Sequence, residues 1–103
     1  MNAIYDNKEK ILKLEMSEEI DHCIAEKIRN RADFEIQKYM PKKVLMDFNN
    51  VSFMDSAGIG MILGRYKNIN MLGGTLELIN VTPSIKKVLE MSGILKIIKI
   101  IEN

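Results

Sequence analysis

Residues 44–80 read VLMDFNNVSFMDSAGIGMILGRYKNINMLGGTLELIN and contain two apolar segments that flank a helical pattern. Val44–Phe48 is apolar except at Asp47 and Thr75–Asn80 alternates in polarity, so both are predicted to be strands. Between them, apolar residues recur at spacings of three and four, which predicts a helix over residues 57–71 that a glycine pair ends. A strand, a helix and a strand in this order predict a right-handed crossover between parallel strands.

The residues before this unit predict two strands and a helix. Residues 2–5 are predicted to form a short strand, and Ile11–Met16 alternates with period two, as a half-buried strand does. Residues 22–40 carry an apolar residue at about every fourth position, which predicts an amphipathic helix. Asp21 stands where an N-cap belongs, and Pro41 closes the far end.

The residues after this unit predict one more helix and one more strand. Thr82 and Pro83 are a hydroxyl cap and a proline at the first helical position, Gly93 ends this helix, and residues 97–101 form a strand. The order β-β-α-β-α-β-α-β predicts an α/β fold with a mixed, mostly parallel sheet of about five strands. Because several strands alternate instead of being apolar throughout, we expect the helices to pack mainly on one face.

The composition is that of one soluble domain. Of the 103 residues, 47% are hydrophobic and 28% charged, and the net charge of +1 gives no reason to expect nucleic-acid or membrane binding. The start lacks the apolar segment of a secretory signal, no apolar run approaches the ~18 residues of a membrane span, and Cys23 has no second cysteine to pair with. We therefore expect a cytoplasmic protein with one domain, residues 1–103.

Asp55 and Ser56 lie between a predicted strand end and the following helix, where an N-cap belongs. In parallel α/β sheets, ligands and partners meet the carboxyl ends of strands, so Ser56 is expected at an exposed functional edge. A phosphate there would carry about −1.5 to −2 charge beside the positive end of a helix, which favours anions. Such a modification would change docking without unfolding the domain. A plain helix cap is the alternative interpretation.

Three glycines follow Ser56 within the predicted helix, although glycine costs a helix interior roughly 1 kcal/mol relative to alanine. Gly58 and Gly60 lie around the first turn, where missing side chains would let another protein approach Ser56. Gly60 and Gly64 share one stripe of the helix, and we expect them to allow close packing against a neighbouring element of the same domain.

Other chemistries fit this stretch less well. In a dinucleotide-binding fingerprint the third glycine would stand one residue before Gly64, and the chain is short for a cofactor domain. A serine-hydrolase elbow needs glycine at the place of Met54, and His22 would have to be the base. The sequence has no Cys/His cluster for a metal. We expect no catalytic residue, cofactor or metal site.

Three segments together resemble the anti-sigma-factor antagonists of the STAS domain family, and among them the sporulation members. These segments are EIDHCIAEKI, FMDSAGIGMILGRYKNI with its following glycine pair, and TPSIKKVLEMSGILKII. The similarity runs over residues 11–100, nearly the whole chain. It implies a single STAS-like domain with helices packed on a mixed sheet, which agrees with the element order above.

The resemblance also implies a phosphorylation switch. Unphosphorylated members bind an anti-sigma factor that is an ATP-dependent serine kinase, which frees a sigma factor, here expected to be of the sporulation sigma-F type. The kinase then phosphorylates the serine after the aspartate, which falls on Ser56, and a phosphatase restores the binding form. The positions implied to contact the partner are Asp21, Asp55, Ser56, Ala57, Gly58, Ile59 and Gly60. Such a protein is a kinase substrate and not an enzyme, and we expect a monomer when it is free.

The chain departs from the family pattern at three places, one of which is Ser17-Glu18-Glu19 before Asp21, where relatives usually have glycine in the second place. Ala57 stands where relatives often have a second serine, which leaves one candidate hydroxyl. Relatives usually continue into a final helix, which is absent or truncated here and would leave an apolar edge strand less covered. Three alternatives stay open: a STAS module of another kinase pathway such as general stress response, a small nucleotide-binding protein, and a scaffold that assembles through a sheet edge.

Overall fold

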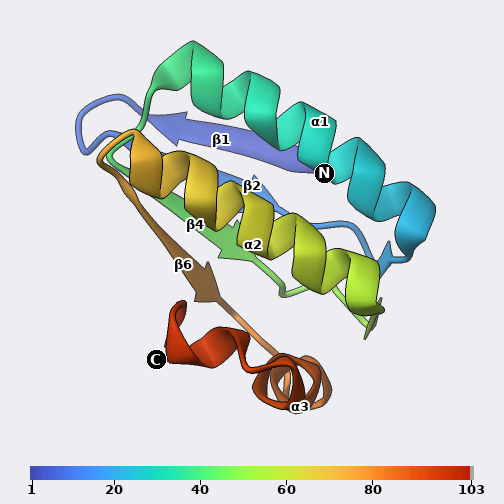
Figure 1. Cartoon of the computed structure of the whole chain (residues 1–103). Coiled ribbons are helices and arrows are strands. Elements are labelled where there is room, and N and C mark those ends of the chain that lie inside the picture. Colours follow the sequence, from blue (N-terminus) through green and yellow to red (C-terminus); the bar gives the residue numbers. More distant parts are fainter. Residues whose placement is uncertain (103) are drawn as a thin grey trace.

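A computed structural model describes residues 1–102 of the chain. Figure 1 shows the long helices α1 and α2 side by side across the sheet, with α3 near the C-terminal end of the chain. The elements are β1 (Asn2–Asp6), β2 (Ile11–Glu15), β3 (Glu19–Ile20), α1 (His22–Tyr39), β4 (Lys43–Asp47), β5 (Phe53–Met54), α2 (Ser56–Met71), β6 (Thr75–Ile79), α3 (Pro83–Ser92), the short 3-10 helix η1 (Ile94–Lys96) and β7 (Lys99–Ile101).

The main sheet has five strands in the order β1-β2-β4-β6-β7. β1 runs antiparallel to β2, and every other neighbouring pair in this sheet is parallel. A helical segment joins each parallel strand to its neighbour: α1 joins β2 to β4, α2 joins β4 to β6, and α3 with η1 joins β6 to β7. The prediction of a mixed, mostly parallel sheet of five strands is therefore confirmed.

The two faces of the sheet differ in what covers them. Under the helices, buried side chains form rows across β2, β4 and β6: Leu12, Val44 and Leu76, then Leu14, Met46 and Leu78. The opposite face carries ion pairs, among them Lys13–Asp47 at 3.5 Å and Lys43–Glu77 at 2.9 Å. Figure 1 shows both long helices on the same side of the sheet, which confirms that the helices pack mainly on one face.

The predicted helix ends are present in the structure. Asp21 caps α1, and Met40 ends it in a left-handed conformation with φ 47°, directly before a proline. Thr82 caps α3, and Gly93 ends it with φ 81°. Among the described helices, none is both long and apolar enough to cross a membrane.

The region after α3 differs from the prediction. The pattern over residues 97–101 predicts a strand, whereas β7 has three residues and follows the η1 turn. The amides of Ile97 and Ile98 donate to the Ile94 carbonyl at 3.1 and 3.0 Å, so they are not available to the sheet. The turn also buries Ile98 and leaves Ile97 53% exposed.

Candidate functional site

Two short strands outside the main sheet bring the starts of α1 and α2 together. β3 and β5 pair in parallel, with Ile20 opposite Met54. The pairing continues one residue further, because the Asp55 amide donates to the Ile20 carbonyl at 3.2 Å. Asp21 and Asp55 are therefore neighbours at one edge of the molecule. This pairing could not be predicted from the sequence, because two-residue strands have no periodicity to recognise.

Asp21 and Asp55 occupy the same structural position, the N-cap of the helix that follows. The Ile24 amide donates to Asp21 Oδ1 at 2.9 Å, and the Ala57 amide donates to Asp55 Oδ1 at 2.8 Å. Asp55 is thus the cap of α2, which settles the choice between Asp55 and Ser56 that the sequence left open. The edge formed by Asp21, His22, Asp55 and Ser56 is called the rim below.

Ser56 is the first residue of α2, and its side chain is exposed. Within residues 1–102 no hydrogen bond involves its hydroxyl, because Asp55 takes the capping role. The unpaired amides at a helix start stabilise a nearby anion by roughly 0.3–1 kcal/mol. The position can therefore carry a negative group.

The three glycines of α2 have different surroundings. A Cβ at Gly58 would overlap the Met54 side chain and lie 3.2 Å from Ile20 Cγ2, so this buried glycine lets α2 pack on β3 and β5. At Gly60 and Gly64 a Cβ would meet nothing within 4 Å. The expectation that Gly60 and Gly64 serve internal packing is wrong, because their flank of α2 faces an open groove. The surface of α2 is therefore open at Gly60, whereas Gly58 faces the interior of the domain.

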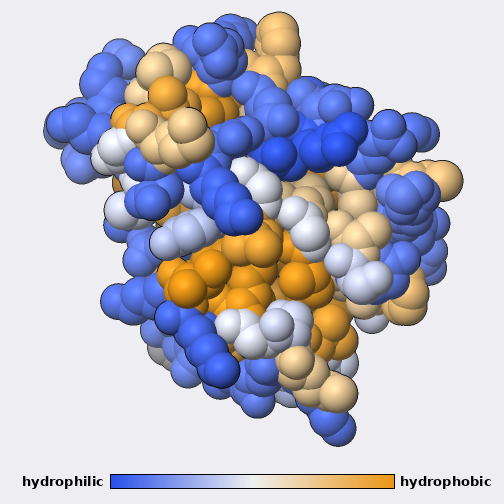
Figure 2. Space-filling view, in the orientation of Figure 1, coloured by the Kyte–Doolittle hydropathy of each residue, from blue (hydrophilic) through white to orange (hydrophobic). Residues whose placement is uncertain are grey.

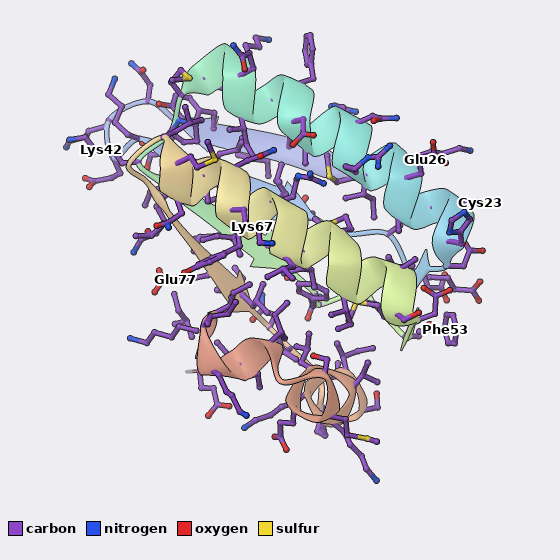
Figure 3. All side chains as sticks on the ribbon, in the orientation of Figure 1. Cys23, Glu26, Lys42, Phe53, Lys67 and Glu77 are labelled. Atoms are coloured by element: carbon purple, nitrogen blue, oxygen red, sulfur yellow. The ribbon has the colours of Figure 1, made fainter. Side chains whose placement is uncertain are left out.

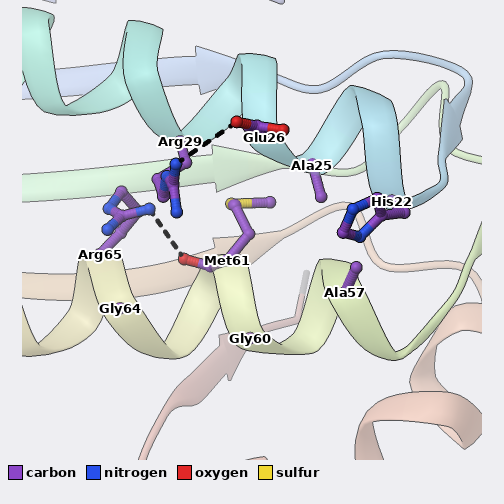
Figure 4. A pocket seen from close by; sticks show the side chains of 9 residues that line it. All are labelled: His22, Ala25, Glu26, Arg29, Ala57, Gly60, Met61, Gly64 and Arg65. Atoms are coloured by element: carbon purple, nitrogen blue, oxygen red, sulfur yellow. Dashed lines mark hydrogen bonds and ion pairs between the residues drawn. The ribbon is translucent and has the colours of Figure 1, made fainter.

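This groove lies between α1 and α2 and has a volume of about 510 Å³ (Figure 4). Small residues from both helices form part of its wall: Ala25, Ala57, Gly60 and Gly64. His22 stands at the end of the groove that adjoins the rim, and its ring points toward α2 near Ala57. The groove therefore opens next to the exposed hydroxyl.

The far part of the groove carries two arginines with carboxylate partners. Arg65 is 6% exposed, with its Nε 2.7 Å from Asp33 Oδ1 and its Nη1 donating to the Met61 carbonyl at 3.5 Å. Burial lowers the pKa of the Arg65 guanidinium, Asp33 opposes that shift, and Arg29 adds to it. Arg29 lies 3.8 Å from Glu26. This part of the groove is therefore charged, with each arginine beside an acidic residue.

Phe53 is an exposed aromatic residue beside the rim that sequence analysis did not single out. Figure 3 shows it at the end of the molecule where α1 begins, on the same side as Cys23. It is 50% exposed, whereas its neighbour Met54 is 4% exposed. Successive strand residues point to opposite sides, so Phe53 points outward once Met54 is known to point inward. The outward direction of Phe53 could not be predicted from the sequence, because it depends on the β3–β5 pairing.

The helical side of the molecule has a hydrophilic and a hydrophobic part. Figure 2 shows hydrophilic residues over α1 and a gathering of hydrophobic residues between α2 and the α3–η1 segment. The half-buried apolar residues of these elements include Ile59, Leu63, Tyr66, Val88 and Leu95. Ile59 lies about one helical turn from Ser56, so an apolar flank of α2 reaches the rim.

Known proteins resemble this chain along most of its length. The STAS domain family matches residues 2–103. The anti-sigma F factor antagonist of Paenibacillus polymyxa is 39% identical over 93 residues, which is 90% of this chain and 80% of the relative. The anti-sigma-B factor antagonist of Bacillus subtilis is 35% identical over 51 residues, which is 50% of this chain and 47% of the relative.

The fold has also been solved in a relative, SpoIIAA. Its unphosphorylated form superposes with a TM-score of 0.76 at 24% identity, covering 99% of this chain and 87% of that one. Its phosphorylated form superposes with a TM-score of 0.69 at 27% identity, covering 92% and 86%. The family match over nearly all residues and the 39% identical relative agree with the observed sheet order and helices. The chain belongs to the STAS domain family.

Proposed function

We propose that this chain is an anti-sigma-factor antagonist whose binding is switched off by phosphorylation of Ser56. The observation that carries the proposal is the exposed Ser56 hydroxyl at the start of α2, which Asp55 leaves free by taking the capping role. The similarity to an anti-sigma F factor antagonist, and to SpoIIAA, which has a phosphorylated form, supports it.

In the unphosphorylated state, the rim binds an anti-sigma factor that is also a serine kinase and carries the ATP. Binding releases a sigma factor of the sporulation sigma-F type. The proposed contact residues are Asp21, Asp55, Ser56, Ala57, Ile59 and Gly60, with Gly58 holding α2 in place behind them. The chain is then a kinase substrate and not an enzyme, and it acts as a monomer in the cytoplasm.

The kinase then transfers the γ-phosphoryl group of ATP to Ser56 Oγ, and a serine phosphatase later hydrolyses the ester. The new phosphate carries about −1.5 to −2 charge next to the carboxylates of Asp21 and Asp55. A partner surface that fits a neutral hydroxyl now meets bulk and negative charge, so docking is lost. The fold is kept, because a helix start favours an anion.

A second pathway is supported by one comparison. The anti-sigma-B factor antagonist of Bacillus subtilis is 35% identical over half of this chain. The alternative function is therefore the same switch in another kinase pathway, such as general stress response. Binding measured in parallel to the anti-sigma factors of both pathways distinguishes the two, since the cognate partner should bind more tightly.

The test of the switch is incubation with the anti-sigma kinase and Mg-ATP, followed by intact mass and peptide mapping. We expect one added phosphate, absent in Ser56→Ala. Ser84→Ala is the matched control, because Ser84 is another exposed serine in the first turn of a helix, and its phosphorylation should be unchanged. Phosphate that persists in Ser56→Ala, or no phosphate with the kinase of either pathway, would contradict the proposal.

A further inference from the structure

His22 and Ser56 occupy equivalent positions in two paired segments. Each is the first residue of a helix, each follows an aspartate N-cap, and each cap follows a strand of the β3–β5 pair. Neighbouring parallel strands lie about 4.8 Å apart. The pairing extends to the Asp55 amide, which donates to Ile20 at 3.2 Å. The backbone therefore brings the starts of both helices next to each other.

The His22 side chain points across the rim toward α2. It lines the groove together with Ala57, the residue after Ser56, and Figure 4 shows its ring directed toward that residue. Over residues 1–102 its imidazole takes part in no hydrogen bond or ion pair. A neutral imidazole has one donor and one acceptor nitrogen, and a protonated one has two donors and a positive charge. His22 therefore has hydrogen-bonding capacity that the unmodified protein leaves unused.

The charges around the rim determine which groups could stabilise a phosphate on Ser56. The Asp21 and Asp55 carboxylates are both present there as helix caps. On the groove walls, Arg29 is beside Glu26 and Arg65 is beside Asp33, and both arginines lie further along the groove than His22. A phosphate on Ser56 would add charge next to two carboxylates, so a nearby cation would stabilise it.

We propose that His22 pairs with the phosphate of phosphorylated Ser56 and holds it over the open end of the α1–α2 groove. This inference rests on the proposed function, since it requires Ser56 to be the modified residue. The pairing closes the approach past Ala57 and Gly60 that the unmodified rim offers. Phosphorylation then blocks docking by covering the groove as well as by adding charge.

The test measures the phosphate itself and needs no kinase. Phosphoserine is inserted at position 56 of the full chain during translation, and the phosphorus NMR shift is followed through the second phosphate ionisation near pH ~6. We expect the second pKa of the phosphate to be about half a unit higher in His22→Gln than with His22 present, because the imidazolium favours the dianion. The difference should shrink in high salt, as for other partly exposed charge pairs.

Two controls make the measurement specific to the imidazole. Cys23→Ser changes the next residue, also exposed and in the same helix turn, and should leave the titration unchanged. His22→Asn is the second variant if His22→Gln does not fold by circular dichroism. Coincident curves for the His22 protein and its folded variants would overturn the pairing, as would an equal change in Cys23→Ser. Failure of the kinase to modify Ser56 would instead overturn the proposed function, while this titration would still report the pairing.

Discussion

The starts of α1 and α2 are built alike but present different side chains. Both follow a strand of the β3–β5 pair, and both are capped by an aspartate that accepts an amide hydrogen bond. The first helical residue is an imidazole in α1, at His22, and a hydroxyl in α2, at Ser56. The comparison teaches that the backbone supplies the same position twice, and that the side chain alone decides which helix start carries a hydroxyl.

The largest expected effect is from placing a charge on the hydroxyl position. Ser56→Asp should weaken anti-sigma factor binding by roughly 100-fold or more, because a like charge or an unpaired desolvated charge at an interface costs several kcal/mol. Ser56→Ala should bind as tightly as the unmodified chain and resist dissociation by ATP. Isothermal titration calorimetry measures both. Equal affinities of the two variants would contradict the prediction that a charge at position 56 controls binding.

The next effect separates the two kinds of glycine in α2. Gly58→Ala should be less stable than Gly60→Ala by roughly 1–3 kcal/mol, since both gain the same helix propensity but only Gly58 is packed against Met54 and Ile20. Urea denaturation of the two variants gives the difference in the free energy of unfolding. Gly60→Ala is the matched control for Gly58→Ala. Similar midpoints would show that Met54 and Ile20 make room for the added methyl group without a loss of stability.

A smaller effect separates capping from binding at Asp21. Asp21→Ala should lower the free energy of unfolding by roughly 1 kcal/mol, because the Ile24 amide loses its acceptor. Asp21→Asn keeps an acceptor oxygen and should keep the stability while weakening partner binding. Thermal unfolding and calorimetric titration of both variants separate the two roles. If Asp21→Asn binds like the unmodified chain, the carboxylate acts only as a cap.

The smallest effect lies away from the rim, at the exposed Lys86–Glu102 pair, whose atoms are 2.7 Å apart. The hydrogen bond and charge of Lys86 lower the pKa of Glu102, and those of Glu102 raise the pKa of Lys86. The pair therefore stabilises the fold at neutral pH. Its contribution is lost as pH falls through the lowered Glu102 pKa or rises through the raised Lys86 pKa. The melting temperature is measured against pH for Glu102→Gln and for the unmodified chain. The Glu102→Gln value should be slightly lower, and only at pH values between the Glu102 pKa and the Lys86 pKa.

The long elements could be predicted from the sequence because their periods are sustained. The stripe of α2 and the alternation of β2 each span several repeats, and Asp21 and Thr82 mark helix starts by chemistry that needs no tertiary partner. The same local logic placed Ser56 at a helix start, and the structure places it there with an exposed side chain.

The parts that could not be predicted depend on contacts between distant segments. The β3–β5 pair has no period of its own, so the approach of the two helix starts was not visible. Arg65 interrupts an apolar stripe and is buried beside Asp33 of α1, which pairs with it. Which of Gly58 and Gly60 faces inward depends on where β5 lies beneath α2.

The most direct test of the switch compares one partner with two forms of the same folded chain. The anti-sigma factor is titrated with unmodified protein and with protein carrying phosphoserine at Ser56, while amide NMR spectra report the fold of each form. The account predicts strong binding of the first form, loss of roughly 100-fold or more in the second, and unchanged spectra away from the rim. Equal affinity, or loss of binding through unfolding, would contradict it.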